Sequence, residues 1–286
     1  MMMTRAVHPQ ATSSDRRALG CGIRGAAFRA MGGLLLPLLV LSCASDPDPE
    51  RIIERSIEAH GVDALSDAKV TFDFRGRQFA VTHQNGWFRQ ERRYEADGAH
   101  VREVLTNEGT FREIDGAPVP LTDSERSSVE TGVNSVLYFA FLPFRLDDPA
   151  VIARYLGEEI VDGERYDRVE VTFRPEDGGR DWEDRFLYWF HQGEGTLDYL
   201  AYLYHVGDGG TRFRRAVNRR LVDGLVVQDH ENFVAPGTDT LEDYGRLYEE
   251  GALEWVSDIE LENVRVEPPP EGFPDDAEAP RAPATL

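Results

Sequence analysis

The chain has 286 residues, 41% of them hydrophobic, and 52 acidic against 31 basic side chains give it a formal net charge of −21 at pH 7. This length is sufficient for one domain with a sizeable core. So acidic a chain argues against binding to nucleic acid or to an anionic membrane surface. Both cysteines, Cys21 and Cys43, lie among the first 43 residues, which excludes a disulfide framework in the remainder.

The first 42 residues have the pattern of a secretory signal peptide. Basic residues, including Arg16, Arg17 and Arg24, precede a short apolar stretch at residues 31–42. A basic region, an apolar region and a small residue before the cut are typical of such signals. A membrane-spanning helix needs about 20 apolar residues, more than this stretch contains. The pattern therefore predicts a cleaved leader.

Cys43 follows the apolar stretch directly, in Leu41-Ser42-Cys43-Ala44. This arrangement resembles a bacterial lipoprotein signal, in which the cysteine is acylated and becomes the first residue. The alternative is an ordinary cleaved signal with a coincidental cysteine. Because Ala44 rather than aspartate follows, the resemblance implies a lipid anchor in the outer membrane, with the domain facing the periplasm. Residues 43–49 would then be a lipidated tether.

Residues 50–60 are predicted to form a helix that ends at His60-Gly61 and has Ile53 and Ile57 on its apolar face. Alternating strands are predicted next, with turn signals such as Asn85-Gly86 between them. These strands are expected at residues 70–74, 78–83, 87–94, 100–105 and 110–114. Because short loops join them, successive strands should be antiparallel neighbours.

The middle of the chain changes to a helical pattern. Thr122 and Glu125 predict the capped start of a helix that runs toward Leu137. Pro149 predicts a second helix at residues 150–156. Strands resume at residues 166–173, 185–191, 197–204, 212–221, 225–233 and 254–266. About 10–11 strands with a few helices predict a mainly β (α+β) fold, a single curved antiparallel sheet with helices packed on it. The domain is expected at residues 50–267, followed by a disordered acidic, Pro-rich tail at 268–286.

Two apolar segments are candidates for ligand binding. Residues 197–204 become apolar on both faces of the predicted strand, which requires cover on both sides. They form either a central strand or the floor of a hydrophobic cavity. Residues 136–144 form either a helix end that plugs the open sheet or a lid over that cavity. The candidate lining residues are Tyr138, Phe139, Phe141, Phe144, Trp189, Tyr202 and Tyr204.

No motif specific for catalysis is present, because the sequence lacks G-x-S-x-G and H-E-x-x-H. His191 with Glu194, or His205 with Asp208, are the pairs that could bind a metal or serve a hydrolase. The histidines are otherwise scattered, and we expect neither a metal nor a cofactor. The glycine-rich residues 207–210 are predicted as a hairpin turn, because a phosphate loop would be followed by a helix.

Five arginines between residues 212 and 220 stand out in so acidic a chain. Arg212 and Arg214 should share one face of the predicted strand, and Arg215 should lie on the other. Cross-strand pairing with acids such as Asp229 and Glu231 is the simplest explanation. A site for an anionic head group or for a partner is the alternative.

Two stretches resemble an uncharacterised family of bacterial lipoproteins with a domain of unknown function. They are Ala59-His60-Gly61 and the run from Leu197 to Phe233, which contains Gly209-Gly210-Thr211-Arg212. That family looks like the periplasmic lipoprotein carriers, whose fold is an unclosed β-barrel with helices across its concave face. The resemblance covers about residues 50–266 and implies no catalytic residues. Lipoprotein carriers are soluble, so an acylation site favours a fixed ligand holder over a shuttle.

The sequence thus predicts a non-enzymatic, outer-membrane-anchored lipoprotein that binds a lipid or another apolar small molecule in the concavity of a curved sheet. One alternative is a structural or interaction module of the envelope whose core is filled by its own side chains. A hydrolase of unknown substrate is the second alternative.

Overall fold

The computed structural model describes residues 46–175, 182–205, 209–237 and 240–273. All of them belong to the second of the two units into which the chain divides, Met1–Ala44 and Ser45–Leu286. Several predictions fall outside the described residues: the leader, Cys43 with its acylation and the start of the tether, Asp208 in the predicted turn, and the tail beyond residue 273.

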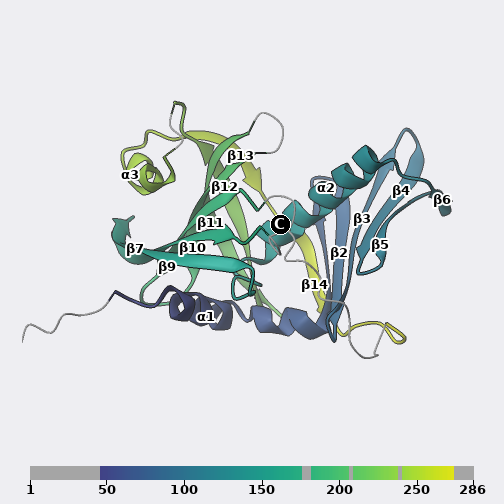
Figure 1. Ribbon diagram of the computed structural model, residues 1–286, viewed down its shortest axis with the longest axis horizontal. Helices are drawn as coiled ribbons and strands as arrows, with labels where there is room; N and C mark the ends of the chain where they lie inside the picture. Colours follow the sequence, from purple (N-terminus) through teal and green to yellow (C-terminus); the bar gives the residue numbers. More distant parts are fainter. Residues whose placement is uncertain (1–45, 176–181, 206–208, 238–239, 274–286) are drawn as a thin grey trace, which may run out of the picture. The chain divides into compact units, whose positions relative to one another are not determined.

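Fourteen strands form two antiparallel sheets in the described part of the chain (Figure 1). In spatial order, sheet A contains β14 (Glu262–Glu267), β1 (Ala68–Phe74), β2 (Arg77–Gln84), β3 (Trp87–Ala96), β4 (Ala99–Thr106), β5 (Gly109–Ile114) and β6 (Ala117–Val119). Sheet B contains β13 (Glu254–Ile259), β12 (Leu225–Val234), β11 (Gly210–Val222), β10 (Leu197–Tyr204), β9 (Arg185–His191), β8 (Glu164–Phe173) and β7 (Val151–Val161). The edge strands β6 and β7 do not pair, so the arrangement stays open. The prediction of a mainly β, unclosed antiparallel fold is confirmed, although it is divided into two sheets.

The hairpin turns follow the sequence signals closely. Asn85-Gly86 has φ angles of 50° and 79°, and Asp97-Gly98 has 52° and 78°. Positive φ at both central residues defines the type I′ turn, whose twist matches that of the flanking strands. The same pattern occurs at Asp115-Gly116, Asp162-Gly163 and Asp223-Gly224. These turns explain why successive strands are hydrogen-bonded neighbours.

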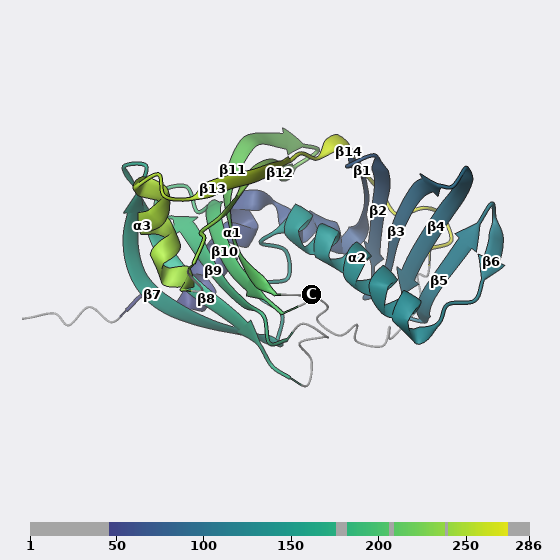
Figure 2. The ribbon, with the colours of Figure 1, turned by 90° about the horizontal axis from the view of Figure 1, so that it is seen from above.

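The helices are α1 (Pro49–His60), η1 (Val62–Asp67), α2 (Asp123–Phe141), η2 (Leu241–Asp243) and α3 (Tyr244–Glu249). Gly61 ends α1 in the left-handed conformation, as predicted. Thr122 and Glu125 form a reciprocal capping box at the start of α2. In both ribbon views α2 runs along sheet A from the side of β5 toward sheet B (Figures 1 and 2).

The two sheets are joined where β13 ends in sheet B and β14 begins in sheet A. Leu261, in the short connection, donates its amide hydrogen to Asp229 Oδ1 at 2.9 Å. Arg220 binds the same carboxylate oxygen at 3.1 Å and also donates to the carbonyl of Leu261. The turn between the sheets is therefore fixed to β11 and β12. The predicted strand at residues 254–266 is in fact these two strands, one in each sheet.

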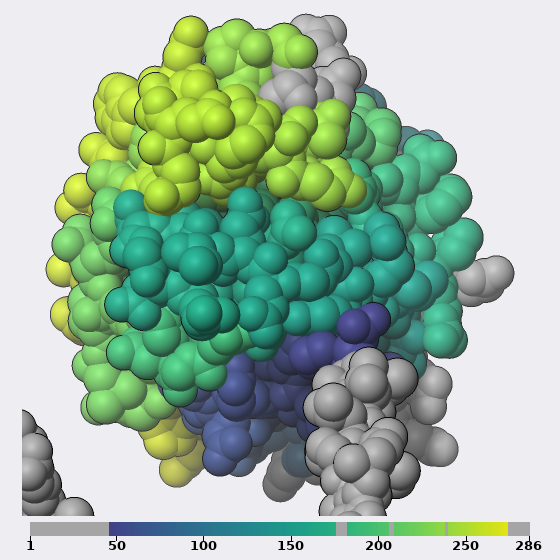
Figure 3. All heavy atoms as spheres, turned by 90° about the vertical axis from the view of Figure 1, so that its left-hand side faces the viewer, coloured from purple at the N-terminus to yellow at the C-terminus, as the bar shows by residue number. Residues whose placement is uncertain are grey.

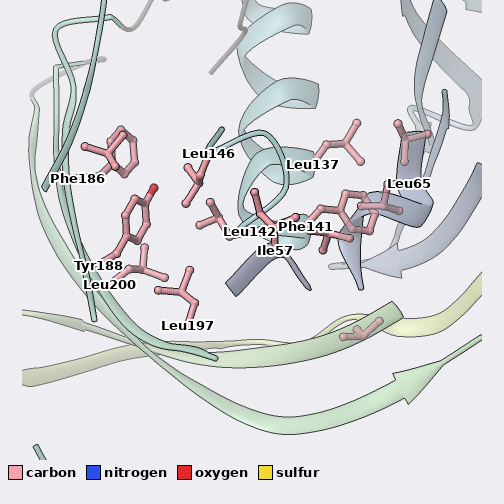
Figure 4. Packing of buried hydrophobic residues seen from close by; sticks show 14 of the residues in the cluster. Ile57, Leu65, Leu137, Phe141, Leu142, Leu146, Phe186, Tyr188, Leu197 and Leu200 are labelled. Atoms are coloured by element: carbon pink, nitrogen blue, oxygen red, sulfur yellow. The ribbon is translucent and has the colours of Figure 1, made fainter. Parts of the chain in front are cut away.

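The main hydrophobic core lies between the sheets and takes residues from both. Phe72 and Phe79 of sheet A stack at 5.4 Å, and Phe141 of α2 meets Phe72 edge-on at 5.8 Å. Figure 4 shows Tyr188 and Leu200 of sheet B pointing toward the same core. Burial of this apolar surface against both sheets holds α2 in place.

A second hydrophobic cluster covers the other face of sheet B. Trp189, Tyr199 and Phe213 project to that face, and Tyr244 of α3 stacks on Phe213 at 5.8 Å. Figure 3 shows this side of the described unit, with residues of α3 above, β7 in the middle and α1 below. The prediction that residues 197–204 need cover on both faces is confirmed, because β10 is buried on each side.

One predicted helix, at residues 150–156, is wrong: Ala150 lies in a turn, and residues 151–156 belong to strand β7. Asp148 accepts a hydrogen bond from the amide of Ala150 at 3.0 Å and forms a turn rather than a helix start. β-branched Val151 and Ile152 then favour the strand, which pairs with β8 along most of its length. The short strand β6 and the helices η1, η2 and α3 were not predicted. The structure accordingly has more strands than the expected 10–11.

Candidate ligand-binding site

A cavity of about 420 Å³ lies between α2, the inner face of sheet B and the connection between the sheets. Helix α2 contributes Val136, Phe139 and Ala140, which share one helix face because they are three and four residues apart. Ile259 and Leu261 border the cavity at the connection. The cavity therefore sits at the edge of the main core, where the two sheets diverge.

Sheet register builds the aromatic wall of this cavity. Phe186 of β9 faces Tyr202 of β10 across the ladder, and their rings stack at 5.8 Å. Phe139 of α2 approaches Tyr202 to 4.8 Å, so the helix and the sheet hold the cavity between them. The hydroxyl groups of Tyr138 and Tyr188 bond to each other at 2.6 Å. Because its hydroxyl group is used in that bond, Tyr138 presents mainly its ring to the cavity.

Basic groups also line the cavity. Arg212 and Arg214 of β11 both line it, as the shared strand face predicted. The Arg214 guanidinium lies 3.9 Å from the ring centre of Phe139 and donates to Tyr202 Oη at 2.9 Å. The Arg212 guanidinium lies over Tyr204 at 5.4 Å. Such cation–π contacts hold a guanidinium against an aromatic wall without neutralising its charge.

Buried polar groups accompany these arginines. His230 and Asn232 of β12 line the cavity, and Asn232 stands opposite Arg214 in the ladder. Neither Asn232 Oδ1 nor Arg214 Nε, both buried, has a hydrogen-bond partner among the described residues. Burial lowers the pKa of His230 to about 3, and the positive charge of Arg214 adds to the effect. The imidazole is therefore neutral at ordinary pH.

The structure brings together four of the predicted lining residues: Tyr138, Phe139, Tyr202 and Tyr204 all line the cavity. The other three candidates lie elsewhere. Phe141 is part of the main core, because it projects from another side of α2 than Phe139. Phe144 borders a smaller cavity of about 190 Å³, next to His83.

Trp189 is separated from the cavity by the sheet itself. It alternates with Tyr188 and Phe190 along β9, so it belongs to the cluster on the opposite face. Its indole nitrogen donates to Glu159 Oε2 at 2.7 Å. Phe186 and Asn232 also line the cavity, although no sequence pattern marked them as lining residues. Arg212 and Arg214 were flagged by their strand spacing, which was the available signal.

The remaining arginines of β11 behave as cross-strand pairing predicted. Arg215 binds Glu231 at 3.2 Å. Arg220 binds Asp229, and Arg219 forms an ion pair with Asp198 of β10. On β11, therefore, Arg212 and Arg214 border the cavity, whereas Arg215, Arg219 and Arg220 pair with acids.

The histidines do not gather into a site. His205 Nδ1 lies 3.0 Å from Asp184 Oδ1. His191 Nδ1 accepts the amide hydrogens of Gly193 and Glu194 at 3.1 and 2.9 Å. Within the described ranges, no group of three or more His, Cys, Asp or Glu side chains is arranged to hold a metal ion. None of the helices there combines the length and the hydropathy that a bilayer-spanning helix requires.

The fold and the cavity define a class of protein: two open antiparallel sheets that, together with a long helix, enclose a mainly apolar site. The model of the family of unknown function DUF6503 matches residues 31–261, so the chain belongs to that family. This confirms the expected membership of a family without an assigned function. No curated protein matches the chain.

Several solved structures are similar at low sequence identity. A LolA superfamily protein from Nitrosomonas europaea is 13% identical, with a TM-score of 0.46, over 79% of this chain and 96% of that one. A DUF1329 family protein from Desulfovibrio piger is 12% identical, with a TM-score of 0.40, over 80% and 96%. The lipoprotein LppX from Mycobacterium tuberculosis is 16% identical, with a TM-score of 0.28, over 58% and 91%.

Proposed function

We propose that the protein is a non-enzymatic lipoprotein that is held in the outer membrane by an acylated Cys43 and binds a lipid or another apolar small molecule in the cavity beneath α2. The observation that carries the proposal is the cavity itself. Its volume of about 420 Å³ is within the range of about 300–1,000 Å³ that is usual for small-molecule sites. Five aromatic side chains of α2, β9 and β10 contribute to its wall: Tyr138, Phe139, Phe186, Tyr202 and Tyr204.

The composition of the wall supports an apolar ligand. Phe139, Phe186 and Tyr202 present ring faces and edges to the cavity, and Val136 and Ala140 add aliphatic surface. Burial of a hydrocarbon chain contributes about 0.8 kcal/mol per methylene group. A ligand whose hydrocarbon chain buries about six methylene groups would therefore be held with useful affinity.

Photo-crosslinking of the full-length protein in mild detergent tests the binding site. The probe is a diazirine-bearing dodecanol, and labelled peptides are identified by mass spectrometry. We expect saturable labelling on α2 and β10. Phe139→Ala should raise the half-saturating concentration about tenfold, because an aromatic wall residue is lost. Phe111→Ala is the matched control, because Phe111 is 51% exposed and lies outside the cavity.

Two outcomes would contradict the binding proposal. One is labelling that avoids the cavity elements, and the other is an equal response to Phe139→Ala and Phe111→Ala. Absence of saturable labelling would move the interpretation to an envelope interaction module whose core is filled by its own side chains.

The anchor is tested separately in cells labelled with radioactive palmitate. Cys43→Ala should remove the label and shift the protein from the outer-membrane fraction to the soluble fraction. Cys21→Ala is the matched control, since it changes the other cysteine but preserves Leu41-Ser42-Cys43. Palmitate that persists on the Cys43→Ala protein would overturn the anchor.

A further inference from the structure

Three guanidinium groups face the cavity, those of Arg75, Arg212 and Arg214. Within the described residues, none of the three forms an ion pair with a carboxylate. Arg75 donates to Ser257 Oγ at 3.2 Å, Arg212 to the carbonyl of Thr211, and Arg214 to the hydroxyl of Tyr202. These partners are neutral, so the hydrogen bonds themselves do not neutralise the three positive charges.

Arg215, on the opposite face of the same strand, shows that this is not a general property of β11. Its guanidinium binds the Glu231 carboxylate at 3.2 Å. Acidic residues greatly outnumber basic ones in the chain, and a carboxylate beside each cavity arginine would be easy to supply. Asp184 is the acidic residue among those that line the cavity, and its Oδ1 already accepts a hydrogen bond from the amide of His205 at 3.1 Å.

Arg214 is the most buried of the three, with 9% of its surface exposed. Its Nε, a buried donor, has no hydrogen-bond partner among the residues that the structure describes. A buried charge without an opposite charge, and a buried donor without an acceptor, each raise the free energy of the folded state. An anionic oxygen in the cavity would offset both effects, because guanidinium groups bind carboxylate and phosphate through charge-assisted hydrogen bonds.

The basic groups and the apolar wall belong to the same cavity. Phe139 contacts both parts, because the Arg214 guanidinium lies over its ring and its ring centre is 6.2 Å from that of Phe186. We infer that the ligand is an amphiphile with an anionic head group, carboxylate or phosphate, held by Arg214 and Arg212, with its hydrocarbon chain along α2. This inference rests on the proposed function, since it specifies the ligand class of the same cavity.

The test compares three diazirine-bearing probes that differ only at the head: dodecanoate, dodecyl phosphate and dodecanol. Each is titrated against the full-length protein in mild detergent at pH 8, and cavity peptides are quantified. We expect at least one anionic probe to saturate at a concentration at least tenfold lower than the alcohol, a difference of about 1.4 kcal/mol. The anion that gains more distinguishes a fatty acid from a lipid phosphate.

Arg214→Gln should reduce that advantage to about twofold or less while labelling by dodecanol changes little. Arg215→Gln is the matched control, because Arg215 lies on the same strand and faces away from the cavity. If Arg214→Gln fails to fold, the less buried Arg212→Gln should lower the advantage severalfold. High salt should also weaken it, since screening acts on the partly exposed charges.

The outcomes separate the two proposals. Equal labelling by the three probes, all within the cavity, would overturn the anionic ligand and leave apolar binding intact. A preference for anions that survives Arg214→Gln and Arg212→Gln would also overturn it, because the charges would then play no part. Failure of every probe to label the cavity would overturn both proposals.

Discussion

At the scale of single residues, burial keeps three histidines neutral. Loss of hydration lowers the pKa of His60 and His83 to about 4 and that of His230 to about 3. His60 shows how such a ring is used: its Nε2 accepts the amide hydrogen of Leu197 at 3.0 Å, which ties the end of α1 to β10. An imidazolium could not accept that hydrogen bond.

These histidines predict a loss of stability in acid. In the unfolded chain an imidazole titrates near 6.5, so below that pH the unfolded state binds more protons than the folded state. The free energy of unfolding should therefore fall as the pH falls from about 6.5 to about 4. For His60 the contribution is on the order of 3 kcal/mol. Urea unfolding at a series of pH values measures it.

A pair of variants isolates the effect of His60. His60→Gln should make the dependence of the unfolding free energy on pH shallower across this window, although it also lowers stability at neutral pH. His100→Gln is the control, because the side chain of His100 is 79% exposed. The explanation fails if His60→Gln retains the wild-type slope.

At the scale of the elements, helix α2 contributes side chains both to the main core and to the cavity wall. Phe141 packs into the main core, whereas Phe139, two residues earlier, lines the cavity and is only partly buried. They point in different directions because an α-helix has 3.6 residues per turn, so side chains two residues apart lie on nearly opposite sides. The helix therefore positions the cavity wall through side chains that do not themselves reach the cavity.

This division predicts different consequences for two alanine variants. Phe141→Ala should lower the free energy of unfolding by about 3–5 kcal/mol, as is usual for a buried phenylalanine. Phe139→Ala should lower it clearly less, because its ring borders open space. Urea unfolding of both variants, monitored by circular dichroism, gives the comparison. Equal losses would show that the cavity wall and the core are not distinct parts of α2.

The strands show the same division by their alternation. In β9, Tyr188 and Phe190 belong to the core between the sheets, and Trp189 belongs to the cluster beneath α3. In β11, Arg214 faces the cavity and Arg215 faces a glutamate. The sequence predicted which residues share a face, but it did not predict what each face meets.

At the scale of the whole described unit, the two sheets share one core. Phe72 of sheet A and Phe186 of sheet B belong to the same cluster, and Phe141 of α2 packs between elements of both. The connection at Leu261 is held by Asp229 and Arg220. Sheet B has a second cluster beneath α3, but its inner face packs with sheet A into this shared core.

A shared core predicts a single cooperative unfolding transition. Two variants, one that retains Trp87 in β3 as the only tryptophan and one that retains Trp189 in β9, report on the separate sheets. For each variant, the urea midpoint measured by fluorescence should coincide with the midpoint that the same variant shows by circular dichroism. A sheet A transition at a clearly lower urea concentration would show that the sheets unfold separately.

Local signals explain how much of the fold was predictable. The Asn-Gly and Asp-Gly turns, the capping box at Thr122 and the glycine after His60 each act within a few residues, and the corresponding elements are present. The errors arose where long-range pairing prevailed. Strand β7 replaced a predicted helix because pairing with β8 prevailed over the helix-start signal at Pro149.

The candidate site divides in the same way. Period-two alternation placed Arg212 with Arg214, and four of the seven predicted lining residues meet at one cavity. Trp189 could not be assigned from sequence, because both faces of its strand are apolar and the pattern does not indicate which one meets α2. Phe141 has the aromatic side chain expected of a lining residue, and only the direction in which it leaves the helix places it in the core.

By itself, the sequence determined most of the antiparallel strands, their turns and the two principal helices, because these depend on backbone preferences of neighbouring residues. Only the tertiary structure decided that the strands divide into two sheets at Leu261, and that Arg212 and Arg214 of β11 border a cavity while Arg215 meets a glutamate. The physical reason is that a cavity is formed by segments distant in the chain, here α2 and strands β9 to β12, whose approach depends on how the whole core packs.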